Sequence, residues 1–214
     1  MRKHILALFA LLGLIGQPVA AETYVNGTLV YVSPSNPTYL SGLSYRQPGA
    51  ITTFTGTTNV VYYTPLVIYS TVTINALTVS VATGAAGNAR IGLYSNDPTQ
   101  NGPLTKLGEV TTPVDTTNAA TLTGTMPAIT LAPGLYWTAV LFNATPTMTS
   151  LAASDAEQLV QSFIGTNSVS TLFAGSAQAT GWTQPQTYAS GLPATASSIS
   201  RRFNHSALVV FTVQ

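Results

Sequence analysis

The stretch Leu131–Phe142, LAPGLYWTAVLF, has Pro133-Gly134 near its start. Its second half is apolar or aromatic on both alternating faces. Pro and Gly suit the two central positions of a type II turn. The stretch therefore predicts a turn at Pro133-Gly134 followed by a strand.

Tyr136 and Trp137 within this stretch must point to opposite faces of a strand, because successive side chains alternate. Trp137 shares its face with Leu135, Ala139 and Leu141, so we predict that it lies in the core. Tyr136 shares a mixed face with Thr138, Val140 and Phe142. Aromatic side chains fill sandwich cores more often than they form ligand sites. The pair therefore indicates a fold signature and not a binding site.

Other segments also have the pattern of strands joined by turns. In Thr71–Thr83, TVTINALTVSVAT, the apolar alternation slips by one residue after Ile74, which predicts a β-bulge. ARIGLYS and LTKLGEV flank the turn-rich loop NDPTQNGP and predict a hairpin. TLTGTMPAITL and GLYWTAVLF predict a second pair of strands, and SALVVFTV near the chain end predicts a buried strand.

One segment, Ser154–Gly165, has a helical pattern instead. Ser154 precedes Glu157 by three residues, the spacing of a capping box, and apolar residues then recur at helical spacing. Gly165 is suited to the position after the last turn. We predict a short helix that covers one end of a sandwich.

The N-terminal residues 1–21 differ from the rest of the chain. Arg2, Lys3 and His4 precede an apolar run, and QPVAA then leads to Glu22. This order is typical of a cleaved export signal. The apolar run is shorter than the roughly 20 residues that span a membrane, so we expect no stable membrane span. The predicted division is a leader at 1–21 and one domain at 22–214.

The composition excludes several classes of protein. Only 6% of the 214 residues are charged, the net charge is +1 and the basic residues do not cluster, so nucleic-acid binding is not expected. Cys is absent, which excludes disulfides and thiolate metal sites.

The residues that could carry chemistry are few. The carboxylates after the leader are Glu22, Asp97, Glu109, Asp115, Asp155 and Glu157, and their spacing does not favour the opposed pair that a glycoside hydrolase needs. His205 has no accompanying nucleophile motif, which favours a surface or interface role. Asn96, Asp97 and Asn101 could offer oxygen ligands to calcium, but their loop lacks the spaced acidic pattern, so we interpret it as a turn. We expect no enzymatic activity, no cofactor and no metal.

Tyrosine is abundant in the strand-like segments. The candidate surface or ligand aromatics are Tyr62, Tyr63, Tyr69, Trp182 and Tyr188. Exposed rings on a nearly uncharged surface could stack on sugars or pack against another subunit. The alternative is that Tyr is present for its strand propensity. The sequence leaves both interpretations open.

About 190 residues of regularly spaced strands and turns predict an all-β fold, a single antiparallel β-sandwich of jelly-roll type with one short helix. The ordered series YYTPLVI, TVTINALTVSV, GNARIGLYSNDP, LAPGLYWTAV, YASGLPAT and ALVVFTV resembles a β-sandwich module of tailed-phage tail fibres and related virion appendages. The resemblance extends from about Thr38 to Val213. It implies the sandwich fold, a structural role and frequent trimerisation.

We therefore expect a non-enzymatic virion or appendage protein that serves host-surface recognition or assembly. The expected partners are further copies of the chain, with a trimer favoured, other virion proteins or host-surface glycans. The leader supports a different class, an exported bacterial adhesin-like or carbohydrate-binding module. The expected location is the virion or, after removal of the leader, the periplasm or cell exterior.

Overall fold

The computed structural model describes residues 23–25, 28–30, 39–40, 51–68, 70–151, 164, 179–203 and 205–213. The predicted leader at 1–21 lies outside them. The chain divides into two compact units, Met1–Pro37 and Thr38–Gln214. In the first, β1 (Thr23–Val25) and β2 (Thr28–Val30) form an antiparallel pair. The predicted domain begins at residue 22, whereas the unit that contains the sandwich begins at Thr38.

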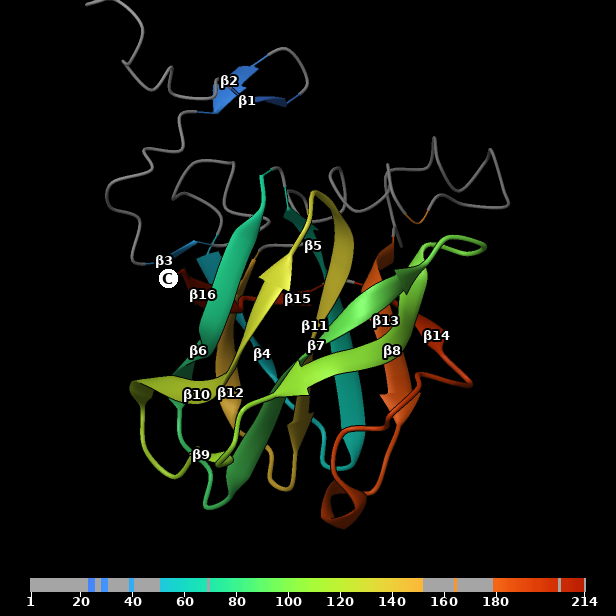
Figure 1. The fold of residues 1–214 in the computed structure, drawn as a ribbon. Coiled ribbons are helices and arrows are strands. Elements are labelled where there is room, and N and C mark those ends of the chain that lie inside the picture. Colours follow the sequence, from blue (N-terminus) through green and yellow to red (C-terminus); the bar gives the residue numbers. More distant parts are fainter. Residues whose placement is uncertain are drawn as a thin grey trace, which may run out of the picture. The chain divides into compact units, whose positions relative to one another are not determined.

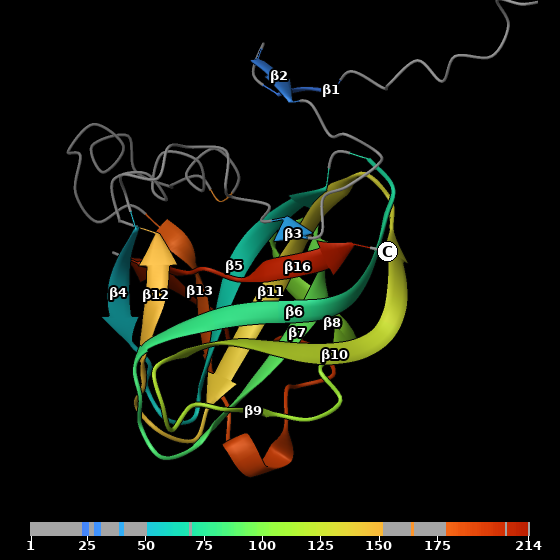
Figure 2. The ribbon, with the colours of Figure 1, turned by 90° about the vertical axis from the view of Figure 1, so that its left-hand side faces the viewer.

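The second unit contains two antiparallel sheets of seven strands each (Figures 1 and 2). The β6 sheet comprises β3 (Tyr39–Leu40), β4 (Ile51–Thr55), β6 (Val72–Thr83), β10 (Ala120–Leu131), β12 (Thr147–Leu151), β15 (Ser206–Ala207) and β16 (Val210–Val213). The β11 sheet comprises β5 (Val60–Ile68), β7 (Asn88–Asp97), β8 (Gly102–Glu109), β9 (Val114–Asp115), β11 (Gly134–Phe142), β13 (Ala179–Pro185) and β14 (Ser200–Phe203). Tyr188–Ser190 forms the short 3-10 helix η2.

The pairing of eight of these strands is nested. β4 pairs with β12, β5 with β11, β6 with β10, and β7 with β8. Because successive pairs alternate between the sheets, the chain is rolled like one long hairpin, which is the winding of a jelly roll. The predicted all-β, jelly-roll-like sandwich is confirmed. Within the described residues, no helix is long and apolar enough to cross a membrane.

The core consists of two groups of buried side chains on opposite faces of the β11 sheet. The inter-sheet core includes Leu66, Leu77, Ile91, Val140 and Phe142, which come from both sheets. The outer cluster lies on the other face of the β11 sheet, where Val61, Tyr63, Tyr94, Trp137, Ala139 and Leu141 pack with Ile164, Ala179, Trp182 and Leu192.

The predicted burial of Trp137 is confirmed, since its side chain is 0% exposed, but it belongs to the outer cluster. The face that looked mixed in sequence is the one that meets the other sheet. Val140 and Phe142 are buried there, and Tyr136 packs against them. Both faces of β11 are covered. The strand therefore lacks the exposed polar face that would show, from the sequence, which side meets the other sheet.

The predicted hairpin of ARIGLYS and LTKLGEV is confirmed as β7–β8. The predicted pairing of TLTGTMPAITL with GLYWTAVLF is wrong, because β10 pairs with β6 and β11 pairs with β5 and β7. The Pro133 link therefore carries the chain from one sheet to the other. Gly134 does not have the positive φ that a type II turn requires at that position, so the predicted turn type is wrong as well.

The predicted bulge in β6 is confirmed. Between β6 and β16 the register moves from Ala76 opposite Thr212 to Ile74 opposite Val213, so two steps on β6 match one on β16. The ladder with β10 is irregular at the same place. The slip lets Ile74 and Leu77 both face the inter-sheet core. The predicted helix at Ser154–Gly165 lies outside the described residues except for Ile164, which is buried in the outer cluster.

Gly181 and Gly134 differ in the space that the neighbouring backbone leaves for a side chain, so they form a matched pair for mutation. A Cβ on Gly181 would lie 2.2 Å from the carbonyl oxygen of Tyr63 in the neighbouring strand, whereas the nearest atom to a Cβ on Gly134 is 3.6 Å away. We expect Gly181→Ala to lower the free energy of unfolding by at least about 1–3 kcal/mol. Gly134→Ala should change it by less than about 0.5 kcal/mol. Urea denaturation of both variants measures this, and equal losses would contradict the geometry.

Candidate functional site

The candidate ligand aromatics do not form an exposed platform. Tyr62 and Tyr63 are 7% and 0% exposed and lie on opposite faces of β5, one in the inter-sheet core and the other in the outer cluster. Trp182 is also buried, Tyr188 packs at the margin of the outer cluster, and Tyr69 lies outside the described residues. Of the two interpretations left open by the sequence, the surface site is wrong for Tyr62, Tyr63 and Trp182, because both faces of the β11 sheet are covered.

The polar atoms of Tyr63 and Trp182 are occupied by hydrogen bonds within the protein, whereas the buried Tyr188 hydroxyl has no hydrogen-bond partner. The Tyr63 hydroxyl donates to Gln184 Oε1 at 3.0 Å, and its ring meets Tyr94 edge-on at 5.1 Å. Burial raises the pKa of Tyr63 and of Tyr94 well above the usual tyrosine range. Trp182 Nε1 donates to the Asn101 carbonyl oxygen at 3.1 Å. These aromatic residues therefore hold the outer cluster together.

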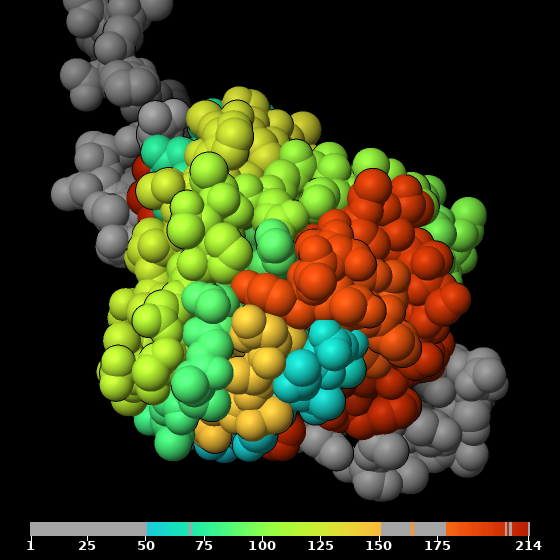
Figure 3. All heavy atoms as spheres, turned by 90° about the horizontal axis from the view of Figure 1, so that it is seen from below, coloured from blue at the N-terminus to red at the C-terminus, as the bar shows by residue number. Residues whose placement is uncertain are grey.

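The outer face of the β11 sheet is covered by residues 186–199, the covering segment. Lys106 N donates to the Ala194 carbonyl oxygen at 2.9 Å, and Ala196 N donates to that of Leu104 at 2.7 Å, so the segment also pairs with the outer edge of β8. Leu192 is buried above Gly92, where a Cβ would lie 2.7 Å from Leu192 Cδ1. In Figure 3 this part of the chain belongs to a continuous orange-to-red surface.

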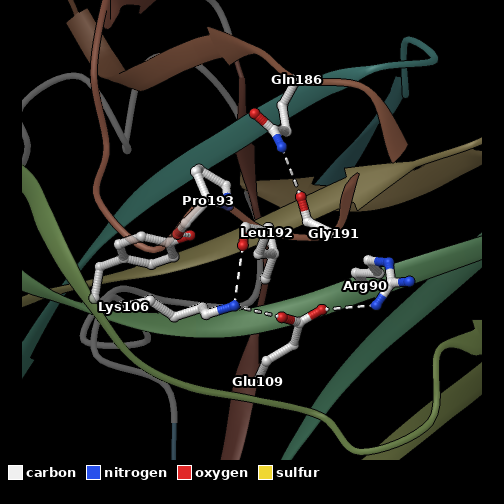
Figure 4. Close-up of polar contacts among 8 residues, drawn as sticks. Arg90, Lys106, Glu109, Gln186, Gly191, Leu192 and Pro193 are labelled. Carbon is white, nitrogen blue, oxygen red and sulfur yellow. Dashed lines mark hydrogen bonds and ion pairs between the residues drawn. The ribbon is translucent and has the colours of Figure 1, made fainter. Parts of the chain in front are cut away.

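An ion-pair cluster of Arg90, Lys106 and Glu109 lies beneath the covering segment (Figure 4). Arg90 Nη1 donates to Glu109 Oε1 at 3.1 Å, and Lys106 Nζ donates to Glu109 Oε2 at 2.9 Å. Lys106 Nζ also donates to the Leu192 carbonyl oxygen at 2.9 Å. Charge-assisted hydrogen bonds are stronger than neutral ones. The cluster therefore fastens the covering segment to β7 and β8.

The Arg90 guanidinium carbon lies 5.1 Å from the centroid of the Tyr188 ring, at the margin of this cluster. Burial raises the pKa of Tyr188, although the positive charge of Arg90 opposes the shift. The ring thus lies against a cation of the protein, and this position is not that of a free stacking platform.

The other described carboxylates are engaged in turns. Asp97 Oδ1 accepts from Thr99 N at 2.9 Å and from Thr99 Oγ1 at 2.7 Å, and Asp115 Oδ1 accepts from Thr117 N at 2.8 Å. These hydrogen bonds lower the pKa of both carboxyl groups. The interpretation of the Asn96–Asn101 loop as a turn is confirmed. Glu22, Asp155 and Glu157 lie outside the described residues.

Asn96 is also occupied by the fold. Its Oδ1 accepts from Trp137 Nε1 at 2.9 Å, and its Nδ2 donates to Asn101 Oδ1 at 3.2 Å. Across the part of the chain that the structure describes, no three His, Asp or Glu side chains lie close enough to hold a metal ion. The oxygens considered for calcium therefore serve the turn and the Trp137 indole.

The outer face of the β6 sheet is lined by hydroxyl groups. Thr and Ser on its strands alternate with buried residues, as in TFT of β4, TVS of β6, TLTGT of β10 and TMT of β12. We call this surface the hydroxyl face; its members are Thr53, Thr55, Thr73, Thr78, Ser80, Thr121, Thr123, Thr125, Thr130, Thr147, Thr149 and Thr212. In Figure 2 the β6 sheet is turned towards the viewer.

Cross-strand pairs link parts of the hydroxyl face. The hydroxyls of Thr78 and Thr123 lie 2.8 Å apart, and those of Thr73 and Thr130 lie 3.0 Å apart. No strand of the β6 sheet contains Asp, Glu, Lys or Arg. The charged side chains that the structure describes all come from the β11 sheet: Arg90, Asp97, Lys106, Glu109, Asp115, Arg201 and Arg202. The candidate residues predicted from the sequence were aromatic and did not include this face, although the alternation of Thr with apolar residues is visible in the sequence.

Removal of the Glu109 charge tests the ion-pair cluster. Glu109→Gln leaves two half-buried cations without their carboxylate, so we expect the free energy of unfolding to fall by about 1–2 kcal/mol after allowance for solvent screening. Trypsin should then cleave faster at Arg90 and Lys106, since the covering segment is held less firmly. Asp97→Asn, a carboxylate change in an exposed turn, is the control. Unchanged cleavage of Glu109→Gln would contradict the fastening role.

A comparison with protein-family models finds no match for the chain, and a comparison with curated proteins finds none either. The features of the molecule that bear on its function are the jelly-roll fold, the occupied outer face of the β11 sheet and the hydroxyl face of the β6 sheet.

Proposed function

We propose that the chain is a non-enzymatic structural module of a virion or a related appendage, and that it serves host-surface recognition or assembly through the hydroxyl face. The observation that carries the proposal is the difference between the two outer faces. The covering segment occupies that of the β11 sheet, whereas the hydroxyl face of the β6 sheet presents exposed Thr residues.

The chemistry of the hydroxyl face suits contact with a neutral, polar partner. Hydroxyl groups donate and accept hydrogen bonds, and their transfer out of water costs much less than the transfer of ionised groups. Charged residues are depleted from the centres of protein interfaces for this reason. A glycan hydroxyl or the backbone of a neighbouring subunit would meet no unpaired charge on this sheet.

Two features at the margins of the face also favour association. Ile51 on β4 is 59% exposed, a large apolar side chain beside the threonines of the same strand. Among the strands that the structure describes, β10 pairs with β6 alone, and it contains no charged residue that would discourage another strand from joining it. Pro127 and the neighbouring register irregularity limit such pairing to part of the strand. We propose a homo-oligomer, with the trimer favoured by the resemblance to phage appendage modules.

The described carboxylates are consistent with a structural role. Glu109 is held by two cations, and Asp97 and Asp115 stabilise turns. Each is therefore engaged in the fold itself.

The leader-like residues 1–21 favour a second candidate, an exported bacterial adhesin-like or carbohydrate-binding module. It would use the same hydroxyl face on a cell surface. This candidate predicts that protein expressed in a Gram-negative host begins at Glu22, as measured by mass spectrometry. Leu11→Arg should keep the protein in the cytoplasm, since a charge in the apolar run costs about 2.5–3.5 kcal/mol on insertion scales. Export of Leu11→Arg with Met1 retained would contradict it.

Charge insertion tests the hydroxyl face. Thr53→Lys and Thr121→Lys place a cation at exposed positions on β4 and β10, where it must be desolvated in any interface. We expect each to weaken binding to a glycan array or to the neighbouring subunit at least tenfold, which corresponds to about 1.4 kcal/mol. Ser190→Lys, an equal change at an exposed site in the covering segment, should bind like the parent chain.

The broader proposal is tested by location. Purified virions or appendages from the producing source should contain the chain, as detected by mass spectrometry. Absence from such particles, together with no glycan or cell-surface binding by folded protein, would overturn the proposed function. Equal binding by Thr121→Lys and Ser190→Lys would overturn only the assignment to the hydroxyl face.

A further inference from the structure

Arg202 is a buried cation at the β14 edge of the sandwich. Arg202 is 8% exposed, and its guanidinium lies against residues of the inter-sheet core. The preceding Arg201 lies near Trp182 of the outer cluster, as expected for the opposite face of the same strand. β14 pairs with β13 through a register shift between Ala179 and Gly181, and bulges of this kind redirect neighbouring side chains.

Two aromatic rings flank the Arg202 guanidinium on one side. Its central carbon lies 4.4 Å from the centroid of the Phe54 ring and 4.6 Å from that of Tyr62, and the two centroids are 5.3 Å apart. These distances form a nearly equilateral triangle, so both rings lie to the same side of the guanidinium carbon. Cation–π attraction to two desolvated rings compensates part of the burial.

Arg202 has no counter-ion among the described residues. The ion pairs found there join Glu109 to Arg90 and Lys106, and buried Arg202 Nη1 has no hydrogen-bond partner. Burial lowers the pKa of Arg202 to about 10, so the side chain remains protonated at neutral pH. Buried charges in proteins are normally paired, because an uncompensated one costs several kcal/mol.

Two further polar atoms without partners come from adjoining elements. Ser150 is 0% exposed, and its Oγ has no hydrogen-bond partner. It lies on the inward side of β12, diagonally across from Phe54, because Met148 is the residue opposite Phe54. His205 Nδ1 is also buried without a partner, and Arg202 contributes to lowering the His205 pKa, after the larger effect of burial.

We propose that this end of the inter-sheet core binds a small monovalent anion, a chloride ion or a carboxylate group, on the side of the Arg202 guanidinium opposite Phe54 and Tyr62. Arg202 supplies the charge and its unpartnered Nη1 donates to the anion. Ser150 Oγ and the neutral His205 ring, which can carry its hydrogen on Nδ1, are the further polar groups at this end. Because the Nη1 atom is buried, the proposed ligand must be small; a whole sugar or peptide would require the strands to separate. The site is independent of the hydroxyl face and of the proposed function.

Anion-dependent stability tests this site with a matched pair of variants. Thermal unfolding is followed in sodium chloride and in sodium formate for the parent chain, Arg202→Met and Arg201→Met. Above the dissociation constant, each tenfold rise in the free anion concentration should raise the folded-to-unfolded ratio of the parent about tenfold. Arg201→Met should keep this dependence and Arg202→Met should lose it. General salt effects act on both variants, so their difference isolates the site. The chloride and formate series distinguish a halide from a carboxylate.

A second measurement applies even where Arg202→Met fails to fold. Bromide soaked into crystals of the parent chain should give an anomalous peak within hydrogen-bonding distance of Arg202 Nη1. For a carboxylate-selective site, formate should instead raise the His205 pKa measured by NMR, because the bound anion offsets the positive charge of Arg202. No peak together with no change in the His205 pKa would overturn the proposal. So would a crystal structure in which a carboxylate of this chain already pairs with Arg202.

Discussion

The burial of β11 on both faces is the constraint on which the rest of the structure depends. Val140 and Phe142 pack into the inter-sheet core, while Trp137 and Leu141 pack beneath the covering segment. A strand in this position must have all its backbone groups paired, and β5 and β7 provide partners along both edges. The nested winding brings β5 and β11 together, and the covering segment then encloses the side that a two-layer sandwich would leave to solvent. The ion-pair cluster joins this additional layer to β7 and β8.

Much of the fold could be predicted because its signals are local. Alternation in β6, the slip after Ile74 and the turn residues between β7 and β8 each depend on a few neighbouring residues. The inner face of β11 could not be predicted, because both faces are apolar and the deciding residues, 186–199, lie far along the chain. Pro133-Gly134 was misleading for a similar reason. A tight hairpin and a passage between sheets use the same residue types, and only the partners of β10 and β11 distinguish them.

The candidate site shows the same limit. Tyr62 and Tyr63 are adjacent aromatic residues, and the sequence alone does not reveal that one enters each buried cluster. Arg201 and Arg202 are an identical pair, but their environments differ because they lie on opposite sides of β14. The threonine alternation could have been recognised, since a period of two that places hydroxyls outside is an ordinary strand signal.

The covering segment also has a consequence for the order in which the protein folds. β11 ends at Phe142, whereas the covering segment begins at Gln186. During synthesis the covering segment therefore follows β11 by more than forty residues, although Ile164 of the outer cluster comes earlier. Contacts that are distant in sequence form slowly, and exposed sheet surface invites association in the meantime. The jelly roll becomes resistant to misassembly only when the covering segment has been synthesised, so a chain stalled or truncated before it would expose an apolar sheet face to other molecules.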